Sequence, residues 1–203
     1  MCYNYHVPVA KPFAVTDRRQ IRALASPVRQ EIVDALSASG PATVSQLASQ
    51  VDLRPDRLYF HLSHLERVGL VKRSGSVPSG RRPAAVFTLA GSSLKVTAAS
   101  PSRAHREAVA DVVDGVLRLA RRNARRALVD GGAVLQGRRR NTFGAGARGW
   151  LTAAETRQAA ALTERLVELH RRGRRRPGTT LRSLVVFSIP LEERRTRRQE
   201  SAR

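Results

Sequence analysis

The most regular pattern of apolar and polar positions lies in the first half of the chain. Val44, Leu47 and Ala48 are spaced as on one face of a helix. Thr43 precedes them and can cap the start of that helix with its hydroxyl oxygen. Asp52 follows, and aspartate tolerates the left-handed backbone of a tight turn better than most residues. The pattern therefore predicts a short helix that ends in a turn.

A second helix is predicted directly after this turn. Pro55 suits its first turn, where the missing N–H costs nothing. Leu58, Leu62 and Leu65 recur at i, i+4 and i+7, which places them on one face toward a core. Gly69 can end the helix as a left-handed cap. Two short helices joined by a tight turn are typical of a helix-turn-helix motif.

The outward face of the second helix is polar, basic and aromatic. This mixture suits the reading of base edges and the binding of phosphates. Arg57 is long enough to bridge two acceptors of a guanine, and Tyr59 can contact a base or a phosphate. His61 and His64 share a face at i, i+3, but nothing near them in the sequence supplies further metal ligands, so contact with a DNA groove is preferred.

Two β-prone runs follow, at residues 70–73 and 85–89. The loop between them is rich in glycine, serine and proline and carries Arg81 and Arg82. This order predicts a β-hairpin with a basic tip, placed as the wing of a winged helix. We expect such a flexible loop to contact the DNA backbone rather than the bases.

The rest of the chain is predicted to be mainly helical. Residues 17–39 suggest two supporting helices, and residues 103–129 suggest one long amphipathic helix. Its expected apolar stripe consists of Val109, Val112, Val113, Val116, Leu117, Ala120, Ala124 and Leu128. Such a stripe needs a second copy of the chain or, alternatively, the rest of the same chain to cover it.

Beyond this helix, the sequence predicts a loop, a further helix and one strand. Residues 130–149 are rich in glycine and arginine and read as a mobile basic loop, without the lysine of a phosphate-binding loop. Thr152 and Glu155 form a capping-box pattern that predicts a helix to about His170. Residues 184–189 are the clearest strand signal of the second half, and a strand there needs a partner.

Composition adds a strong preference for polyanions. The net charge of the 203 residues is +21, and the isoelectric point is near 11.8. A GC-rich genome would explain arginine in place of lysine but not the shortage of acidic residues. Cys2 is the single cysteine, which excludes an intramolecular disulfide and a zinc cluster of cysteines and fits a reducing cytoplasm. No apolar run approaches the ~20 residues of a membrane helix, and the start is unlike a signal peptide.

Two segments carry a resemblance to a known family. Residues 23–32 (ALASPVRQEI) are similar to the opening helices of ArsR-like winged helix-turn-helix transcriptional regulators. Residues 59–71 (YFHLSHLERVGLV) resemble their recognition helix and the start of their wing. The resemblance spans about residues 17–91 and implies a dimeric DNA-binding module that usually represses transcription. Two positions depart from the family. The metal-sensing members have paired cysteines in the first helix of the motif, where this chain has Ala48 and Ser49 and no cysteine. Arg54 replaces the small polar residue that is common at the entry of the recognition helix.

We therefore expect an α+β fold that is mainly α with a small β-wing, followed by a helical C-terminal region with one β-strand. The expected parts are a flexible arm at 1–16, the winged helix-turn-helix domain at 17–91, a linker at 92–102, a helical region for dimerisation or an effector at 103–190, and a disordered charged tail at 191–203.

The expected function is sequence-specific binding of double-stranded DNA by a cytoplasmic homodimer that represses transcription at an inverted-repeat operator. An architectural protein of low sequence specificity is the alternative, and a winged helix used only for protein contacts is a further one. RNA binding is disfavoured because few aromatic residues are available for stacking. No enzyme signature, cofactor, metal or membrane segment is expected. A small-molecule effector of unknown identity stays open. The candidate DNA-binding residues are Thr43, Ser45, Arg54, Asp56, Arg57, Tyr59, Phe60, His61, Ser63, His64, Arg67, Lys72, Arg73, Arg81 and Arg82.

Overall fold

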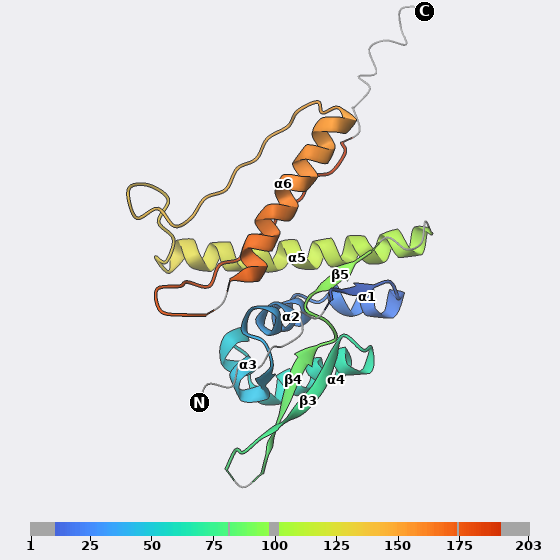
Figure 1. Cartoon of the computed structure of the whole chain (residues 1–203), viewed down its shortest axis with the longest axis vertical. Helices are drawn as coiled ribbons and strands as arrows, with labels where there is room; N and C mark the ends of the chain where they lie inside the picture. Colours follow the sequence, from blue (N-terminus) through green and yellow to red (C-terminus); the bar gives the residue numbers. More distant parts are fainter. Residues whose placement is uncertain (1–10, 81, 98–101, 174, 192–203) are drawn as a thin grey trace, which may run out of the picture.

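The computed structural model describes residues 11–80, 82–97, 102–173 and 175–191. A helical domain with a β-hairpin is crossed by one long helix, α5, and a further helix, α6, projects from it (Figure 1). The elements are β1 Phe13–Val15, α1 Arg18–Leu24, α2 Pro27–Ser39, β2 Ala42–Thr43, α3 Val44–Val51, α4 Pro55–Arg67, β3 Val71–Val77, β4 Ala84–Leu89, β5 Leu94–Val96, α5 Arg103–Val129 and α6 Ala153–Arg172. The expected α+β class with a small β-wing is confirmed.

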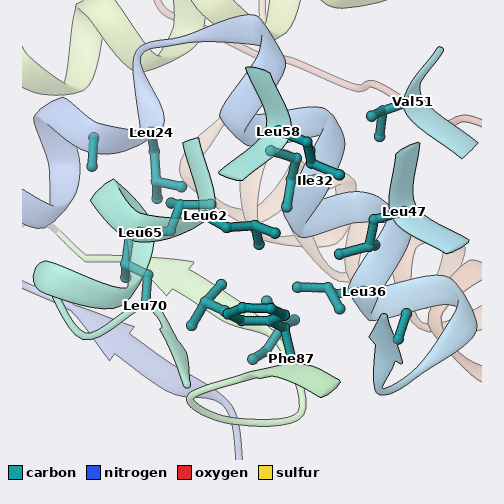
Figure 2. Packing of buried hydrophobic residues seen from close by; sticks show 14 of the residues in the cluster. Leu24, Ile32, Leu36, Leu47, Val51, Leu58, Leu62, Leu65, Leu70 and Phe87 are labelled. Carbon is teal, nitrogen blue, oxygen red and sulfur yellow. The ribbon is translucent and has the colours of Figure 1, made fainter. Parts of the chain in front are cut away.

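The core lies between α1–α4 and the inner face of the hairpin. Leu58, Leu62 and Leu65 of α4 have no exposed surface, as the i, i+4, i+7 pattern predicts. They meet Ile32 of α2 and Phe87 of β4 (Figure 2). Burial of such side chains stabilises a fold by roughly 1.5–3 kcal/mol each, so this cluster holds α4 in place.

Local signals mark the helix boundaries of this domain, and those predicted at Thr43, Asp52 and Pro55 are confirmed. The Asp17 side chain accepts a hydrogen bond from the N–H of Arg19 and caps α1, and Pro27 begins α2. Thr43 and Gln46 form a reciprocal capping box at the start of α3. These local signals fix where each helix begins independently of the tertiary contacts.

Two small sheets complete the domain. β2 and β3 both pair antiparallel with β4, with Ala42 opposite Phe87 and Val71 opposite Leu89. β1 pairs in parallel with β5, so that Phe13 lies opposite Leu94 and Val15 opposite Val96. The expected assignment of residues 13–15 to a flexible arm and of residues 94–96 to a linker is therefore wrong. Each strand is too short to show a periodicity of its own, and each forms because the other satisfies its backbone groups.

Most of the expected arm and tail falls outside the described residues. Residues 1–10 and 192–203 lie beyond the described residues, as do residues 98–101 of the expected linker.

α5 packs on α1 and α2 of its own chain. Gln30 of α2 donates from Nε2 to the carbonyl oxygens of Leu24 (2.7 Å) and Val112 (3.0 Å), which joins α1, α2 and α5. Gly115 allows close approach, because a Cβ atom there would lie 2.5 Å from the carbonyl oxygen of Ala25. These contacts dock α5 firmly on the helical domain.

The buried face of α5 differs from the expected stripe. His105, Ala108, Gly115 and Leu119 are buried, and Leu117, Ala124 and Leu128 of the expected stripe are exposed. Val109, Val112, Val113, Val116 and Ala120 are half-buried at the edges of the contact. The alternative of packing within one chain thus holds for the N-terminal two-thirds of α5. The buried face includes Gly115 and His105, which a search for aliphatic residues at helical spacing does not detect. The predicted face was therefore rotated relative to the observed one.

The chain beyond α5 has few contacts with the rest of the described structure. α6 begins with the expected capping box of Thr152 and Glu155, and none of its residues is buried. Its N-terminal end projects away from the helical domain (Figure 1). The expected strand at residues 184–189 is wrong, because this segment forms no regular secondary structure and pairs with no strand of the described chain. A β-prone run without a neighbouring strand cannot form a ladder.

Candidate DNA-binding surface

The turn between α3 and α4 sets the angle of the candidate recognition helix. Asp52 adopts the left-handed conformation, with φ 53°, and its N–H donates to the carbonyl oxygen of Ala48. Pro55 then starts α4. A carboxylate oxygen of Asp52 also accepts from Arg126 of α5 at 3.4 Å. The turn is therefore held by its own backbone and, weakly, by α5.

The outer face of α4 is fully available to a partner. Arg57, Tyr59, Phe60, Ser63 and Arg67 are exposed, with Phe60 at 71% the most exposed of the aromatic pair. Phe60, Ser63 and Arg67 stand opposite the buried leucines of the same helix, and Arg57 and Tyr59 lie on its two flanks. A cation, hydroxyl groups and two aromatic rings on one rigid helix are suited to the edges and backbone of a duplex.

Other candidates near the motif already have intramolecular partners. The Arg54 side chain pairs with Asp56 at 3.2 Å, although both are largely exposed. The Thr43 hydroxyl is used as the cap of α3, while Ser45 on that helix is exposed. Arg54 can exchange this weak pairing for a phosphate, since exposed ion pairs contribute only about 0–1 kcal/mol, whereas the Asp56 carboxylate can only accept hydrogen bonds, for example from a base amino group.

The two histidines of α4 lie toward the domain rather than on its outer face. His61 and His64 are half-buried, and burial lowers the pKa of each, with further lowering from the charge of Arg29. Both shifts favour the neutral form of the ring. The sequence did not indicate Arg29, which lies on α2 and donates from Nε to the carbonyl oxygen of Ala23. No local spacing could have placed it beside α4, because the two helices meet only in the tertiary fold.

The wing carries the remaining candidates. Arg73 of β3 pairs with Glu66 at 3.1 Å and lies over the ring of Phe87, with 5.7 Å from its guanidinium carbon to the ring centroid. Lys72 and Arg82 are exposed, and Arg81 lies outside the described residues. The hairpin projects from the domain at the end opposite α6 (Figure 1). Its tip is thus accessible, whereas Arg73 is held against the strand.

We predict that the tip of the wing strengthens binding to any duplex without selecting its sequence. Changing Arg81 and Arg82 to alanine should weaken binding to all duplexes similarly and reduce the salt dependence of log K by roughly one to two units. Titrations of labelled duplexes at several salt concentrations measure this slope. The matched control replaces Arg121 and Arg125 of α5, which are exposed, by alanine. A loss confined to one duplex sequence would instead show that the wing reads bases.

Within residues 11–80, 82–97, 102–173 and 175–191, there is neither a metal site nor a membrane-spanning helix. No three His, Cys, Asp or Glu side chains there come close enough together to hold a metal ion. No helix among those residues is long and apolar enough to cross a membrane.

The family comparison decides the nature of this region. A family model described as a helix-turn-helix domain matches residues 24–74, the stretch from the end of α1 into β3. Residues 24–74 are a helix-turn-helix domain. The helix-turn-helix of the expected resemblance is confirmed for these residues, and a helix-turn-helix domain supports a DNA-binding transcriptional regulator. No curated protein matches the chain significantly.

Several solved structures are partly similar to this chain. A transcriptional regulator homologue from Pyrococcus horikoshii is 26% identical, with 55% of this chain and 89% of that chain covered and a TM-score of 0.31. The YusO protein from Bacillus subtilis is 17% identical, with 73% and 79% covered and a TM-score of 0.31. A MarR family protein of Mycobacterium tuberculosis, in complex with salicylic acid, is 19% identical, with 73% and 86% covered and a TM-score of 0.26. With such low TM-scores, the helix-turn-helix assignment rests on the family model and on the geometry of α3, α4 and the wing.

Proposed function

We propose that this protein is a sequence-specific transcriptional repressor that binds an inverted-repeat operator as a homodimer. The observation that carries the proposal is the outer face of α4. Arg57 and Tyr59 are exposed in its first turns, where a helix-turn-helix meets base edges, and the buried leucines on its other side hold it rigid. The net charge of +21 supplies the attraction to phosphates.

Selection of binding sites from random duplexes tests this proposal. Wild type should recover one motif in two inverted copies, and Arg57→Ala should relax the preference at one base pair in each copy. The loss on a specific site should be about 1–3 kcal/mol, since a bidentate arginine–guanine contact has this value. Arg121→Ala removes the same charge from an exposed position of α5 and should leave the motif unchanged. Recovery of the wild-type motif at full strength by Arg57→Ala would show that Arg57 does not read sequence.

A homodimer is supported by the apolar surface that the single chain leaves uncovered. Leu162, Leu166 and Leu169 of α6 recur at i, i+4, i+7 and are all exposed. Exposed apolar faces of this regularity usually mark contacts with another protein surface. The dimer contact is thus assigned to α6 in place of the α5 stripe expected from the sequence.

We expect wild type to elute as a dimer at micromolar concentration, as size-exclusion chromatography with light scattering would show. Leu166→Glu should shift the equilibrium to monomer because it places a charge in the apolar contact. Ala160→Glu adds the same charge to the opposite, exposed side of α6 and should remain dimeric. A wild-type monomer that still binds its operator tightly would contradict the dimer.

The second candidate function is that of an architectural protein that coats DNA with low specificity. It is favoured by exposed arginines far from the helix-turn-helix, among them Arg138, Arg139 and Arg140 of the loop after α5. The same selection experiment separates the two functions. If wild type enriches no motif while binding every duplex in a salt-dependent manner, the architectural function replaces the repressor.

A further inference from the structure

A cavity of about 450 Å³ lies between α2 and the C-terminal half of the chain. Its wall is formed by α2, the end of α3, the middle of α5, the C-terminal turns of α6 and residues 181–184. Pockets for small molecules generally have volumes of about 300–1,000 Å³. The cavity therefore has the size of a ligand site, and both halves of the chain build it.

Two carboxylates of α2 belong to this wall, at Glu31 and Asp34. Glu31 pairs with Arg122 of α5. Asp34 forms no ion pair with any residue that the structure describes, although water can reach its side chain from the cavity. Partial desolvation of its carboxylate by the wall, and secondly the charge of Glu31, raise the pKa of Asp34 to about 6. At neutral pH the cavity thus contains a carboxylate without a positive partner.

The basic residues of the wall are engaged within the chain. Arg182 donates to the carbonyl oxygen of Asn141. Nδ1 of His170 lies 2.9 Å from the carbonyl oxygen of Leu166, and Arg171 also has a partner. Among the charged side chains of the wall that the structure describes, Asp34 is therefore the one without a hydrogen-bond or ion-pair partner.

Apolar side chains form much of the remaining wall. They come from three different elements: Val33 and Ala35 of α2, Leu119 of α5, Val167 of α6. Leu181 and Leu184, from the segment after α6, complete this apolar part of the wall. A partly apolar wall with one charged group that has no partner favours ligands with an apolar body and one opposite charge.

We propose that this cavity binds a small organic cation with an apolar body, whose ammonium group pairs with Asp34. The ammonium group gives Asp34 the ion-pair partner that the fold does not provide. The aliphatic side chains of the wall contact the apolar part of the ligand. Binding at this cavity is independent of the regulatory role proposed above, because no candidate DNA-binding residue lines it.

Three probes with one apolar body test the charge preference. 4-Phenylbutylamine, 4-phenylbutanol and 4-phenylbutyrate differ only in carrying a positive charge, no charge or a negative charge at neutral pH. Isothermal titration calorimetry with the full chain should give an affinity for the amine at least about tenfold above that for the other two. Tighter binding of the carboxylate, or no binding of the amine at millimolar concentration, would overturn the proposal.

A variant then tests the role of Asp34. Asp34→Asn should lower the affinity for the amine by about tenfold or more. Asp111→Asn removes the same charge from an exposed position of α5 and should leave the affinity unchanged. Equal amine affinity in wild type and Asp34→Asn would refute the assignment.

Folding of the variant is checked separately. An acid whose pKa is raised on folding stabilises the fold below its unfolded pKa and loses this contribution as the pH rises through the folded pKa. Ionised Asp34 therefore opposes folding at neutral pH, and Asp34→Asn should melt at or above the wild-type temperature by circular dichroism. A melting temperature below that of wild type would contradict the desolvation of the Asp34 carboxylate in the folded protein.

Discussion

Leu62→Ala is expected to lower the free energy of unfolding by about 2–5 kcal/mol, the range for leucine truncation in a packed core. Leu62 has no exposed surface and lies in the middle of the cluster that joins α4 to α2 and the hairpin (Figure 2). The cavity left behind would loosen the helix that carries the candidate DNA-binding face. Urea denaturation followed by circular dichroism measures the change.

The neighbouring residue supplies the control. Ser63 is exposed on the same helix, and Ser63→Ala should change the free energy of unfolding by no more than about 0.5 kcal/mol. DNA binding of Leu62→Ala should fail together with stability, whereas Arg57→Ala should lose binding without losing stability. Wild-type stability in Leu62→Ala would refute the packing of α4 described above.

Gly115→Leu is expected to destabilise the protein by about 3 kcal/mol, at the upper end of the usual effect of overpacking. The new Cβ atom would meet the carbonyl oxygen of Ala25 at 2.5 Å and the side chain of Gln30 at 3.1 Å, so α5 must move away from α1 and α2. The sign of the effect is informative. Leucine favours a helix over glycine by about 0.8–1 kcal/mol, and an undocked α5 would therefore gain stability.

Thermal melting and hydrogen exchange of the α5 amides measure this effect. Ala110 is exposed on the same helix, so Ala110→Leu should leave both measurements close to wild type. Faster exchange confined to α5 and the ends of α1 and α2 is expected for Gly115→Leu. A rise in melting temperature would mean that α5 does not pack on the domain as described.

The helix-turn-helix was predictable because its signals are local. A cap at Thr43, a left-handed Asp52, a proline at the start of α4 and leucines at helical spacing act within a few residues of one another. The candidate surface follows from the same pattern, since the residues opposite a buried face of a helix are exposed. The boundaries of the two helices of the motif could therefore be predicted without knowledge of the fold.

The features that sequence reasoning missed depend on distant partners. The strands β1 and β5 have three residues each, and neither is recognisable without the other. The docked face of α5 is centred on Gly115, where the absence of a side chain allows close packing. Hydrophobic periodicity cannot register a residue that contributes by its small size.

At residues 184–189 the sequence predicts an element that the structure does not form. Their apolar, β-branched sequence predicts a strand, but no neighbouring strand of the described chain satisfies their backbone groups. Propensity alone does not form a sheet, because the hydrogen bonds of a strand come from its partner. The predicted strand failed for this tertiary reason.

The parallel pairing of β1 with β5 also affects the order of events during synthesis on the ribosome. Phe13 emerges early, but its partner Leu94 follows only after the helices and the hairpin have been made. Chains are synthesised at about 5–20 residues per second, slower than the formation of helices and hairpins. The helices can thus collapse around Leu58 and Leu62 first, and the β1 strand joins last. A nascent chain that stalls before residue 94 would expose the apolar side of Val15, which the finished fold buries completely.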